Sequence, residues 1–260
     1  MPSSVLDLKD VTLYRNEKMV LHNLNLKINS GENWIILGPN GSGKSSLLTM
    51  IQAFLWPQEG EISLMGRRFG EGDIAELRRK IGWVGSDIEK RFNEKETASS
   101  LVLSGCVGTI GVQFEKPEPE HFKKVSQLMS DFGISHLGEK LFGEMSQGEK
   151  RIICIARALM TEPKLLILDE ACAGLDPVAR ELMLKQLENM KLLPSPPCLI
   201  FATHHVEEIR EPFNHVLMLK EGEVLRSGRI DSVLTSENLS LLFGHSISLH
   251  QEKGRWGIYL

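Results

Sequence analysis

The sequence has little cysteine and no long apolar run, and both shortages exclude classes of protein. The four cysteines are widely spaced and form no CxxC pair: Cys106, Cys154, Cys172 and Cys198. Neither a zinc site nor a disulfide framework is therefore expected, and we expect reduced, mostly buried thiols. No segment approaches the about 18 consecutive apolar residues of a membrane span. The first ten residues lack both a basic and an apolar region, so no secretory signal is expected.

Charge of neither sign dominates the chain. The 30 basic and 34 acidic residues give a formal net charge of −4. This balance gives no general electrostatic reason to bind nucleic acid, and we expect no nucleic-acid partner. At 260 residues and 42% hydrophobic content, the chain can bury a core without disulfides or metal. Because reduced thiols, no membrane span and no secretory signal are expected, we expect a cytoplasmic protein.

The hydrophobic pattern predicts an α/β fold. Residues 5–14 and 19–28 alternate apolar and polar side chains, which is typical of half-buried strands in a small antiparallel layer. Residues 33–38, 164–171 and 197–205 contain short continuous apolar runs, as expected for parallel strands covered on both faces. The next prediction is a helix over 47–56, stopped by a proline at 57, with these side chains facing a core: Leu47, Leu48, Ile51, Phe54 and Leu55.

Beyond residue 86 the strand signals fade. The segment 117–134 reads as a helix opened by prolines, and the tail has helical pieces at 230–234 and 238–244 before a hairpin turning near Gly254. We see one domain over 1–260. Its expected parts are a core with an antiparallel β subdomain (1–86 and 161–226), a helical subdomain (87–160) and a C-terminal extension (227–260).

The strongest motif is a glycine loop between the strand at 33–38 and the helix that follows. It matches GxxxxGK(S/T), whose backbone N–H groups surround phosphates while the lysine reaches the β and γ oxygens. Lys44 is that lysine, and the hydroxyl of Ser45 is a candidate ligand for Mg²⁺. The candidate nucleotide-binding residues of this loop are Gly38, Pro39, Asn40, Gly41, Ser42, Gly43, Lys44, Ser45 and Ser46.

Two adjacent carboxylates end the apolar run LLILDE. Alone, Asp169 and Glu170 are more simply a solvated turn, but a phosphate loop in the same chain reverses that preference. In a P-loop fold the strand-terminal aspartate supports Mg²⁺, and a neighbouring carboxylate polarises the attacking water. Asp169 is therefore predicted to be a metal-site residue and Glu170 the general base.

Adenine is the predicted base, because the sequence has no NKxD element of the kind that reads guanine. Tyr14, expected in a loop after the first strand, could stack on a base; stacking tolerates any base, so it supports nucleotide binding in general. A second anion site is predicted at residues 146–160. There Ser146 precedes an apolar helical run, and a hydroxyl-capped helix N-terminus suits an incoming phosphate as well as ordinary capping with Glu149.

Together these residues resemble the ATP-binding subunit of ATP-binding cassette (ABC) transporters from about residue 5 to 225. Tyr14 is similar to the adenine-stacking aromatic, 38–45 to the Walker A loop, MSQGE to the LSGGQ-type signature and LLILDE to Walker B. The D-loop is matched by AGLD at 173–176, and His204 in ATHH is similar to the switch histidine. The resemblance implies an ABC ATPase fold: a P-loop NTPase core with a mainly parallel sheet, an antiparallel β subdomain and a helical insert.

The resemblance also implies a mechanism. ABC ATPases act as head-to-tail dimers, in which the signature of one copy covers the γ-phosphate held by the other's Walker A loop. The cofactors would be ATP and Mg²⁺, and catalysis would fall to Lys44, Glu170 and His204. Contacts to the partner's ATP would come from Ser146, Gln147, Gly148 and Asp176. The implied partners are a second copy of the chain, transmembrane permease subunits and a substrate-binding protein, with the chain peripheral on the inner face of the membrane.

Two departures from the family pattern affect the expected function. Ser86 stands where most members have a glutamine that contacts Mg²⁺, and its shorter reach puts that contact in question unless a water bridges the gap. The signature has Gln147 and Glu149 for a glycine and a glutamine. With the LFG near 242, SQGE resembles ATPases of molybdate and iron-siderophore uptake systems.

The direction of transport is predicted from an absence. The exporter-type TEVGERG element does not occur before the signature, which favours an importer or a cassette without a permease. The leading prediction is the ATP-hydrolysing subunit of an importer. A soluble, non-transport ABC ATPase with a regulatory or repair role is the alternative, which Ser86 keeps open. A binding-only protein conflicts with the intact Lys44, Asp169, Glu170 and His204.

Overall fold

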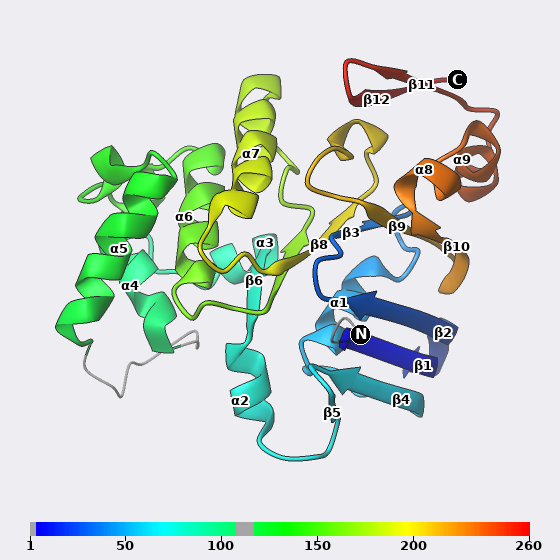
Figure 1. Ribbon diagram of the computed structural model, residues 1–260, viewed down its shortest axis with the longest axis horizontal. Coiled ribbons are helices and arrows are strands. Elements are labelled where there is room, and N and C mark those ends of the chain that lie inside the picture. The colour runs from blue at the N-terminus through cyan, green and yellow to red at the C-terminus, as the bar shows by residue number, and fades with distance from the viewer. Residues whose placement is uncertain (1–3, 108–116) are drawn as a thin grey trace. The chain divides into compact units, whose positions relative to one another are not determined.

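The chain forms two compact units in the computed structural model, which describes residues 4–107 and 117–260 (Figure 1). The first unit comprises residues 1–74 and 198–260, and the second comprises residues 75–197. The predicted division into core, helical subdomain and C-terminal extension is drawn on other grounds and stays a prediction. Within the described residues, no helix is long and apolar enough to cross a membrane.

The first unit contains two sheets and a terminal hairpin. Its elements are β1 (Ser4–Arg15), β2 (Lys18–Asn29), β3 (Trp34–Leu37), α1 (Lys44–Ile51), β4 (Glu59–Leu64), β5 (Arg67–Arg68), β8 (Cys198–Thr203), η5 (Val206–Glu208), β9 (His215–Lys220), β10 (Glu223–Arg229), α8 (Ile230–Val233), α9 (Ser236–Phe243), β11 (Ser248–Glu252) and β12 (Arg255–Tyr259). The predicted antiparallel layer is confirmed, with strand order β2-β1-β4-β5.

The phosphate loop leaves the most buried strand of this unit. β3 pairs in parallel with β8 on one side and with β9 on the other, and all four of its residues are buried. A parallel strand that is buried on both faces is typically apolar along its whole length. This is why Trp34–Leu37 reads as a continuous hydrophobic run. The carboxyl ends of β3 and β8 are in register, with Leu37 opposite Thr203. Residues that follow these two strands are therefore neighbours at the carboxyl ends of the strands.

The helix after the phosphate loop is shorter than predicted. α1 ends at Ile51, and Phe54, which was predicted to face a core, is 59% exposed. Leu55 is only partly buried. The cause is Ala53, whose φ of 61° lies in the left-handed region and stops the helix. No glycine or proline marks this position, so the helical spacing of the apolar residues extended the predicted helix too far.

The tail of the first unit agrees with the prediction. The two helical pieces are α8 and α9, and the hairpin β11–β12 turns through Lys253 and Gly254, both of which have positive φ. Ser236 and Ser240 of α9 fasten the start of the hairpin, since their hydroxyls accept hydrogen bonds from the Leu249 and Ile247 amides at 2.9 Å each. The hairpin is thus tied to the helix before it.

The second unit is mainly helical around one parallel strand pair. Its elements are α2 (Ile74–Arg79), β6 (Ile81–Gly85), α3 (Ser86–Glu89), α4 (Ala98–Ser104), η1 (Gly105–Val107), α5 (Pro119–Asp131), η2 (Ser135–Leu137), η3 (Phe142–Glu144), α6 (Gln147–Leu159), β7 (Leu165–Asp169), α7 (Pro177–Asn189) and η4 (Met190–Leu192). The predicted proline-opened helix is α5, with Pro119 as its first residue. Within this unit α6 contacts α4, α5, α7 and β6, and most of its last nine residues are buried.

Candidate nucleotide-binding site

The phosphate loop has the backbone shape that its glycines predict. Gly41 and Gly43 have φ of 80° and 105°, which side-chain-bearing residues rarely adopt. Gly38 is required for another reason: a Cβ there would lie 2.3 Å from the carbonyl oxygen of Leu219 in β9. The amide of Gly38 donates to the Thr203 carbonyl at 3.4 Å, and the Gly222 amide donates to the Ser42 carbonyl at 3.0 Å. The loop is therefore held against the ends of β8 and β9.

The lysine of the motif lies inside its own loop. The Nζ of Lys44 donates to the carbonyl oxygens of Gly38 and Pro39 at 2.8 and 3.1 Å, and the side chain is 5% exposed. An ammonium group held by the backbone of a glycine loop supplies positive charge where that loop would surround a phosphate anion. Ser45 is exposed at the start of α1, whereas Ser42 and Ser46 are buried.

Two histidines follow the strand next to the phosphate loop. His204 is partly buried and His205 is exposed, and their ring centroids are 4.1 Å apart. Because β8 lies beside β3 in parallel, His204 and the phosphate loop both follow the carboxyl ends of neighbouring strands. The structure therefore places His204 on the side of the first unit that carries the phosphate loop, and its predicted contact with the γ-phosphate stays a prediction.

Tyr14 lies in a strand and not in the predicted loop. It is in β1, opposite Met19, and its ring is 40% exposed. The strand continues to Arg15 because Asn16 and Glu17, both with positive φ, form a two-residue turn into β2. Asparagine and glutamate without glycine are a weak turn signal, which is why the sequence placed the loop too early. An exposed ring can still stack on a base, and that role stays a prediction.

The carboxylates of Walker B lie in the second unit, at the end of its parallel strand pair. β6 and β7 are in register, with Gly85 opposite Asp169. Ser86 and Glu170, the residues that follow these two strands, therefore both lie at the carboxyl ends of the pair. Glu170 has a φ of 47°, a conformation uncommon for residues other than glycine and often found at functional sites. Ser86 is exposed and begins α3.

The donors present suit Mg²⁺, which binds hydroxyl and carboxylate oxygens and keeps several waters. Ser45 offers an exposed hydroxyl, and the Asp169 side chain stands at a strand end. Among the described residues there is no group of three His, Cys, Asp or Glu side chains that could hold a metal by themselves. Each unit therefore presents an oxygen of the kind that Mg²⁺ binds.

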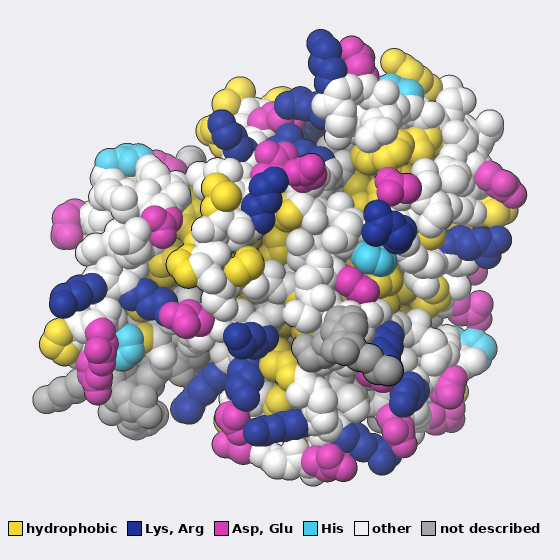
Figure 2. Space-filling model, viewed as in Figure 1, with side chains coloured by type: hydrophobic (Ala, Val, Ile, Leu, Met, Phe, Trp, Pro, Cys, Tyr) yellow, Lys and Arg dark blue, Asp and Glu magenta, His cyan; other side chains and the backbone are white. Residues whose placement is uncertain are grey.

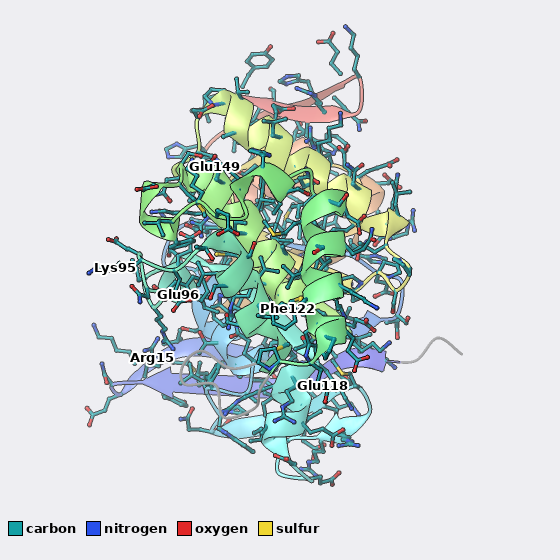
Figure 3. The ribbon with its side chains drawn as sticks, turned by 90° about the vertical axis from the view of Figure 1, so that its left-hand side faces the viewer. Arg15, Lys95, Glu96, Glu118, Phe122 and Glu149 are labelled. Atoms are coloured by element: carbon teal, nitrogen blue, oxygen red, sulfur yellow. The ribbon has the colours of Figure 1, made fainter. Side chains whose placement is uncertain are left out.

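The signature segment is a capped helix start. Ser146 is the N-cap of α6: its Oγ accepts from the Glu149 amide at 3.3 Å, and the Glu149 carboxylate accepts from the Ser146 amide at 2.7 Å. Lys140 donates to the same carboxylate at 2.9 Å. Partial burial alone would raise the pKa of Glu149, but the hydrogen bonds from Lys140 and Ser146 lower it overall. Figure 3 labels Glu149 at this end of the unit.

The D-loop aspartate caps the neighbouring helix. Asp176 accepts hydrogen bonds from the Val178 and Ala179 amides at 2.8 and 3.0 Å at the start of α7. A Cβ on Gly148 would lie 3.3 Å from the Cβ of Ala179, so the first turns of α6 and α7 are in close contact. Ser146 and Asp176 are both exposed. The structure thus gathers the residues predicted to contact a partner's ATP at one edge of the second unit.

Sequence reasoning missed two buried ionic groups near these motifs. Glu89 of α3 and Arg151 of α6 form an ion pair of 2.9 Å with side chains 11% and 4% exposed. Glu208 of η5 is 2% exposed and accepts a hydrogen bond from Thr203. Partners 62 positions apart carry no local signal. The pair at 203 and 208 is local, but a charge in a loop normally faces water.

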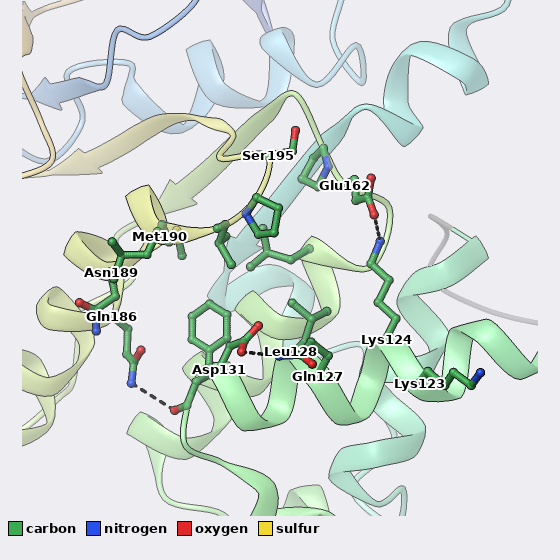
Figure 4. Close-up of a pocket in the computed structure, with 16 residues that line it drawn as sticks. Lys123, Lys124, Gln127, Leu128, Asp131, Glu162, Gln186, Asn189, Met190 and Ser195 are labelled. Atoms are coloured by element: carbon green, nitrogen blue, oxygen red, sulfur yellow. Dashed lines mark hydrogen bonds and ion pairs between the residues drawn. The ribbon is translucent and has the colours of Figure 1, made fainter.

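A cavity in the second unit is separate from all the predicted residues. It has a volume of about 830 Å³ and lies among α5, the ends of α6 and α7, and the segment 192–195 (Figure 4). Its floor includes Leu128, Phe132 and Met190, and its rim includes an ion pair between Lys124 and Glu162.

On the face shown in Figure 2, basic and acidic side chains are interspersed and form no patch of one sign.

A glycine loop after a buried parallel strand, with carboxylates at the end of a second parallel strand, defines a P-loop nucleoside triphosphatase. The sequence profile of the family described as ABC transporter matches residues 21–173. The chain belongs to this family, as an ATP-binding and ATP-hydrolysing subunit with the ABC ATPase fold.

Known proteins resemble the chain over nearly its whole length. It is 40% identical over 248 residues to the uncharacterized ABC transporter ATP-binding protein YmeB of Lactococcus lactis, with 95% of each chain covered. The structure of cbiO1 from Clostridium perfringens, part of the ABC transporter complex cbiONQ, has a TM-score of 0.80 at 30% identity, covering 91% and 93% of the two chains. The dimeric post-hydrolysis structure of the ATP-binding cassette MJ0796, bound to ADP and Pi, has a TM-score of 0.71 at 26% identity, covering 86% and 98%.

Proposed function

We propose that two copies of this chain bind two ATP molecules between them and energise an importer in the membrane. Each triphosphate would be held by the phosphate loop of one copy and covered by the Ser146-capped helix of its twin. The observation that carries this proposal is the exposed edge where the first turns of α6 and α7 meet, capped by Ser146 and Asp176. Two adjacent helix N-termini suit an anion supplied from outside the protomer.

The reaction is an in-line attack of water on the γ-phosphate. A bond forms between the water oxygen and the γ-phosphorus, the bond to the bridging oxygen of ADP breaks, and inorganic phosphate is released. Glu170 would accept the proton of the attacking water, while Lys44 and the loop amides hold the negative charge of the phosphates. His204 would contact the γ-phosphate from the neighbouring strand end.

The metal would be held chiefly by Ser45 and Asp169, with Ser86 reaching it through a water. Mg²⁺ bound there would neutralise phosphate charge. The exposed Ser45 hydroxyl and the strand-end carboxylate of Asp169 support this assignment. Tyr14, whose side chain is exposed in β1, would stack on adenine.

Import is the direction we favour, because the chain lacks the exporter-type element before its signature. Proteins named for phosphonate import and for choline transport are among its relatives. The chain would lie on the inner face of the membrane, bound to permease subunits, and a substrate-binding protein would deliver the cargo. cbiO1, which resembles this chain, is part of the ABC transporter complex cbiONQ.

The test uses the Glu170→Gln variant, which keeps the side-chain size but removes the base. With ATP and Mg²⁺ it should accumulate as a dimer in size-exclusion chromatography with light scattering, while its turnover falls at least about 100-fold. Wild type should dimerise only transiently. A Lys44→Ala/Glu170→Gln variant is the matched control and should stay monomeric. A Glu170→Gln variant that remains monomeric with saturating ATP, or a wild type that hydrolyses no faster, would contradict the proposal.

A non-transport ATPase is the second candidate, and Ser86 favours it. In most family members the residue at this position is a glutamine that couples the nucleotide to the membrane subunit. Affinity purification from detergent-solubilised membranes separates the two functions. Recovery of an integral membrane protein with the tagged chain supports transport, whereas recovery of only water-soluble or nucleic-acid partners supports the alternative.

A further inference from the structure

The turn that presents His204 is closed by a buried hydrogen bond. Thr203, the last residue of β8, donates its hydroxyl to the Glu208 carboxylate at 2.5 Å and accepts the His205 amide at 3.0 Å. Both side chains are almost completely buried, at 1% and 2% exposure. A carboxylate buried in this way is stable only where hydrogen bonds replace its lost hydration. The segment 203–208, which contains His204, is therefore fixed at both ends.

Thr203 also joins this turn to the phosphate loop. Its carbonyl oxygen accepts the amide of Gly38, the first residue of that loop, while its side chain holds Glu208. One residue thus contacts the loop through its backbone and the histidine turn through its hydroxyl. A shift of Thr203 would move both.

The C-terminal hairpin lies against the same turn. β12 contacts η5, the element that contains Glu208 (Figure 1). By register, Leu249, Ile258 and Trp256 share one face of the hairpin, and all three are partly buried. The opposite face carries exposed residues, among them Ser248 and Glu252. One face of the hairpin therefore packs on the rest of the first unit. Its hydrogen bonds to the α9 hydroxyls hold it in place.

We infer that Thr203 and Glu208 are positioning residues that hold His204 in its working orientation, and that the hairpin β11–β12 braces their turn from outside. The inference rests on the role proposed for His204 in ATP hydrolysis. Both residues are almost completely buried, and we assign neither of them a contact with the nucleotide. Their effect reaches the reaction only through the histidine, because they fix the backbone on both sides of it. The extension after residue 227 thereby gains a role within its own protomer.

The central test replaces Thr203 by valine, which has the same shape but no hydroxyl. A displacement of a reacting group by about 1 Å can cost about 100-fold in rate, so Thr203→Val should lower kcat by about tenfold to 100-fold. The KM for ATP should stay within about twofold, because the phosphate-loop backbone contact is retained. Thr203→Ser restores the hydroxyl and should recover most of the rate. Glu208→Met removes the oxygen that accepts the Thr203 hydroxyl, so it tests the same contact from the other side and should also lower kcat.

A double-mutant cycle separates positioning from a general structural role. In a His204→Ala background, Thr203→Val should cause little further loss, since the residue through which it acts is gone. An equal fold-loss in both backgrounds would overturn the inference, as would wild-type kcat in Thr203→Val and Glu208→Met. The proposed function fails differently: there, His204→Ala alone would leave turnover unchanged.

The brace is tested on the two faces of the hairpin. Trp256→Ala removes a partly buried ring from the covered face and should lower kcat several-fold without changing the KM for ATP. Glu252→Ala on the exposed face is the matched control and should behave like wild type. If Trp256→Ala keeps full turnover, the hairpin does not brace the turn.

Discussion

The carboxylate of Glu89 lies 2.9 Å from the guanidinium of Arg151, and both side chains are buried. Glu89 ends the short helix that begins at Ser86, and Arg151 lies one turn into the signature helix α6. The pair therefore ties the segment at the unusual serine to the helix that carries Ser146. It gives the second unit a rigid connection between two motifs 60 positions apart.

Breaking this pair should destabilise the protein strongly. Arg151→Met leaves the Glu89 charge buried without its cation, and we expect a loss of about 3–5 kcal/mol in the free energy of unfolding. The double variant Glu89→Gln/Arg151→Met should regain most of it. Urea denaturation followed by circular dichroism measures both. The matched control is Lys90→Met, which breaks an exposed pair with Asp87 and should change stability little. An Arg151→Met variant as stable as that control would contradict the expectation.

The same carboxylate should make stability depend on pH. Burial raises the pKa of Glu89 and outweighs the opposing effect of Arg151. A carboxyl with a raised pKa holds its proton more tightly in the folded state. This favours folding at a pH below the raised pKa and is lost as pH rises through it. Relative to Glu89→Gln, the wild type should therefore gain stability as pH falls from 7 towards 4.5. A stability difference that is flat over this window would show that Glu89 titrates normally.

Two glycines of the phosphate loop should respond differently to alanine. At Gly38 a Cβ would lie 2.3 Å from the Leu219 carbonyl oxygen, so Gly38→Ala should displace the loop and lower ATP affinity by more than about tenfold. At Gly41 a Cβ has free space, and the cost is only the positive φ, about 1–2 kcal/mol. Calorimetric titration with ATP, alongside thermal unfolding, separates the two. Equal ATP affinities would mean that the contact with β9 does not shape the loop.

The parts of the fold that could be predicted are those written in a local pattern. The phosphate loop needs a fixed spacing of glycines and a lysine, and buried parallel strands need continuous apolar runs, so both were found from sequence. The end of α1 and the position of Tyr14 were not, because Ala53, Asn16 and Glu17 adopt positive φ without a glycine to indicate it. At Asn16 and Glu17, which are exposed, the pairing of β1 with β2 on either side of the turn imposes this conformation.

The candidate site was predicted as a set of motifs but not as a supported structure. The roles of Lys44, Glu170 and Ser146 follow from their residue types and spacing, and they stay predictions. What holds these residues in place depends on contacts that no spacing encodes, such as the Lys140 ammonium on the Glu149 carboxylate and the Thr203 hydroxyl on Glu208. Contacts of this kind become recognisable only when the fold is known.

Ser146 has two possible duties, and substitutions can separate them. Ser146→Ala removes the N-cap of α6 and should cost about 1 kcal/mol in stability, whereas Ser146→Asn and Ser146→Asp keep a capping oxygen and should fold as stably as wild type. In the Glu170→Gln background with ATP and Mg²⁺, the neutral asparagine should still permit the dimer. The aspartate should prevent it, because its charge would face the partner's γ-phosphate.

Light scattering over a range of protein concentrations reports the dimer, and thermal unfolding reports the cap. Equal dimerisation of the asparagine and aspartate variants would mean that no phosphate approaches this helix, since a negative charge there would then cost nothing. Loss of the dimer in step with stability, in Ser146→Ala alone, would leave capping as the only duty of the serine. Separate responses of the two measurements are expected only if an anion from the second copy meets the capped end of α6.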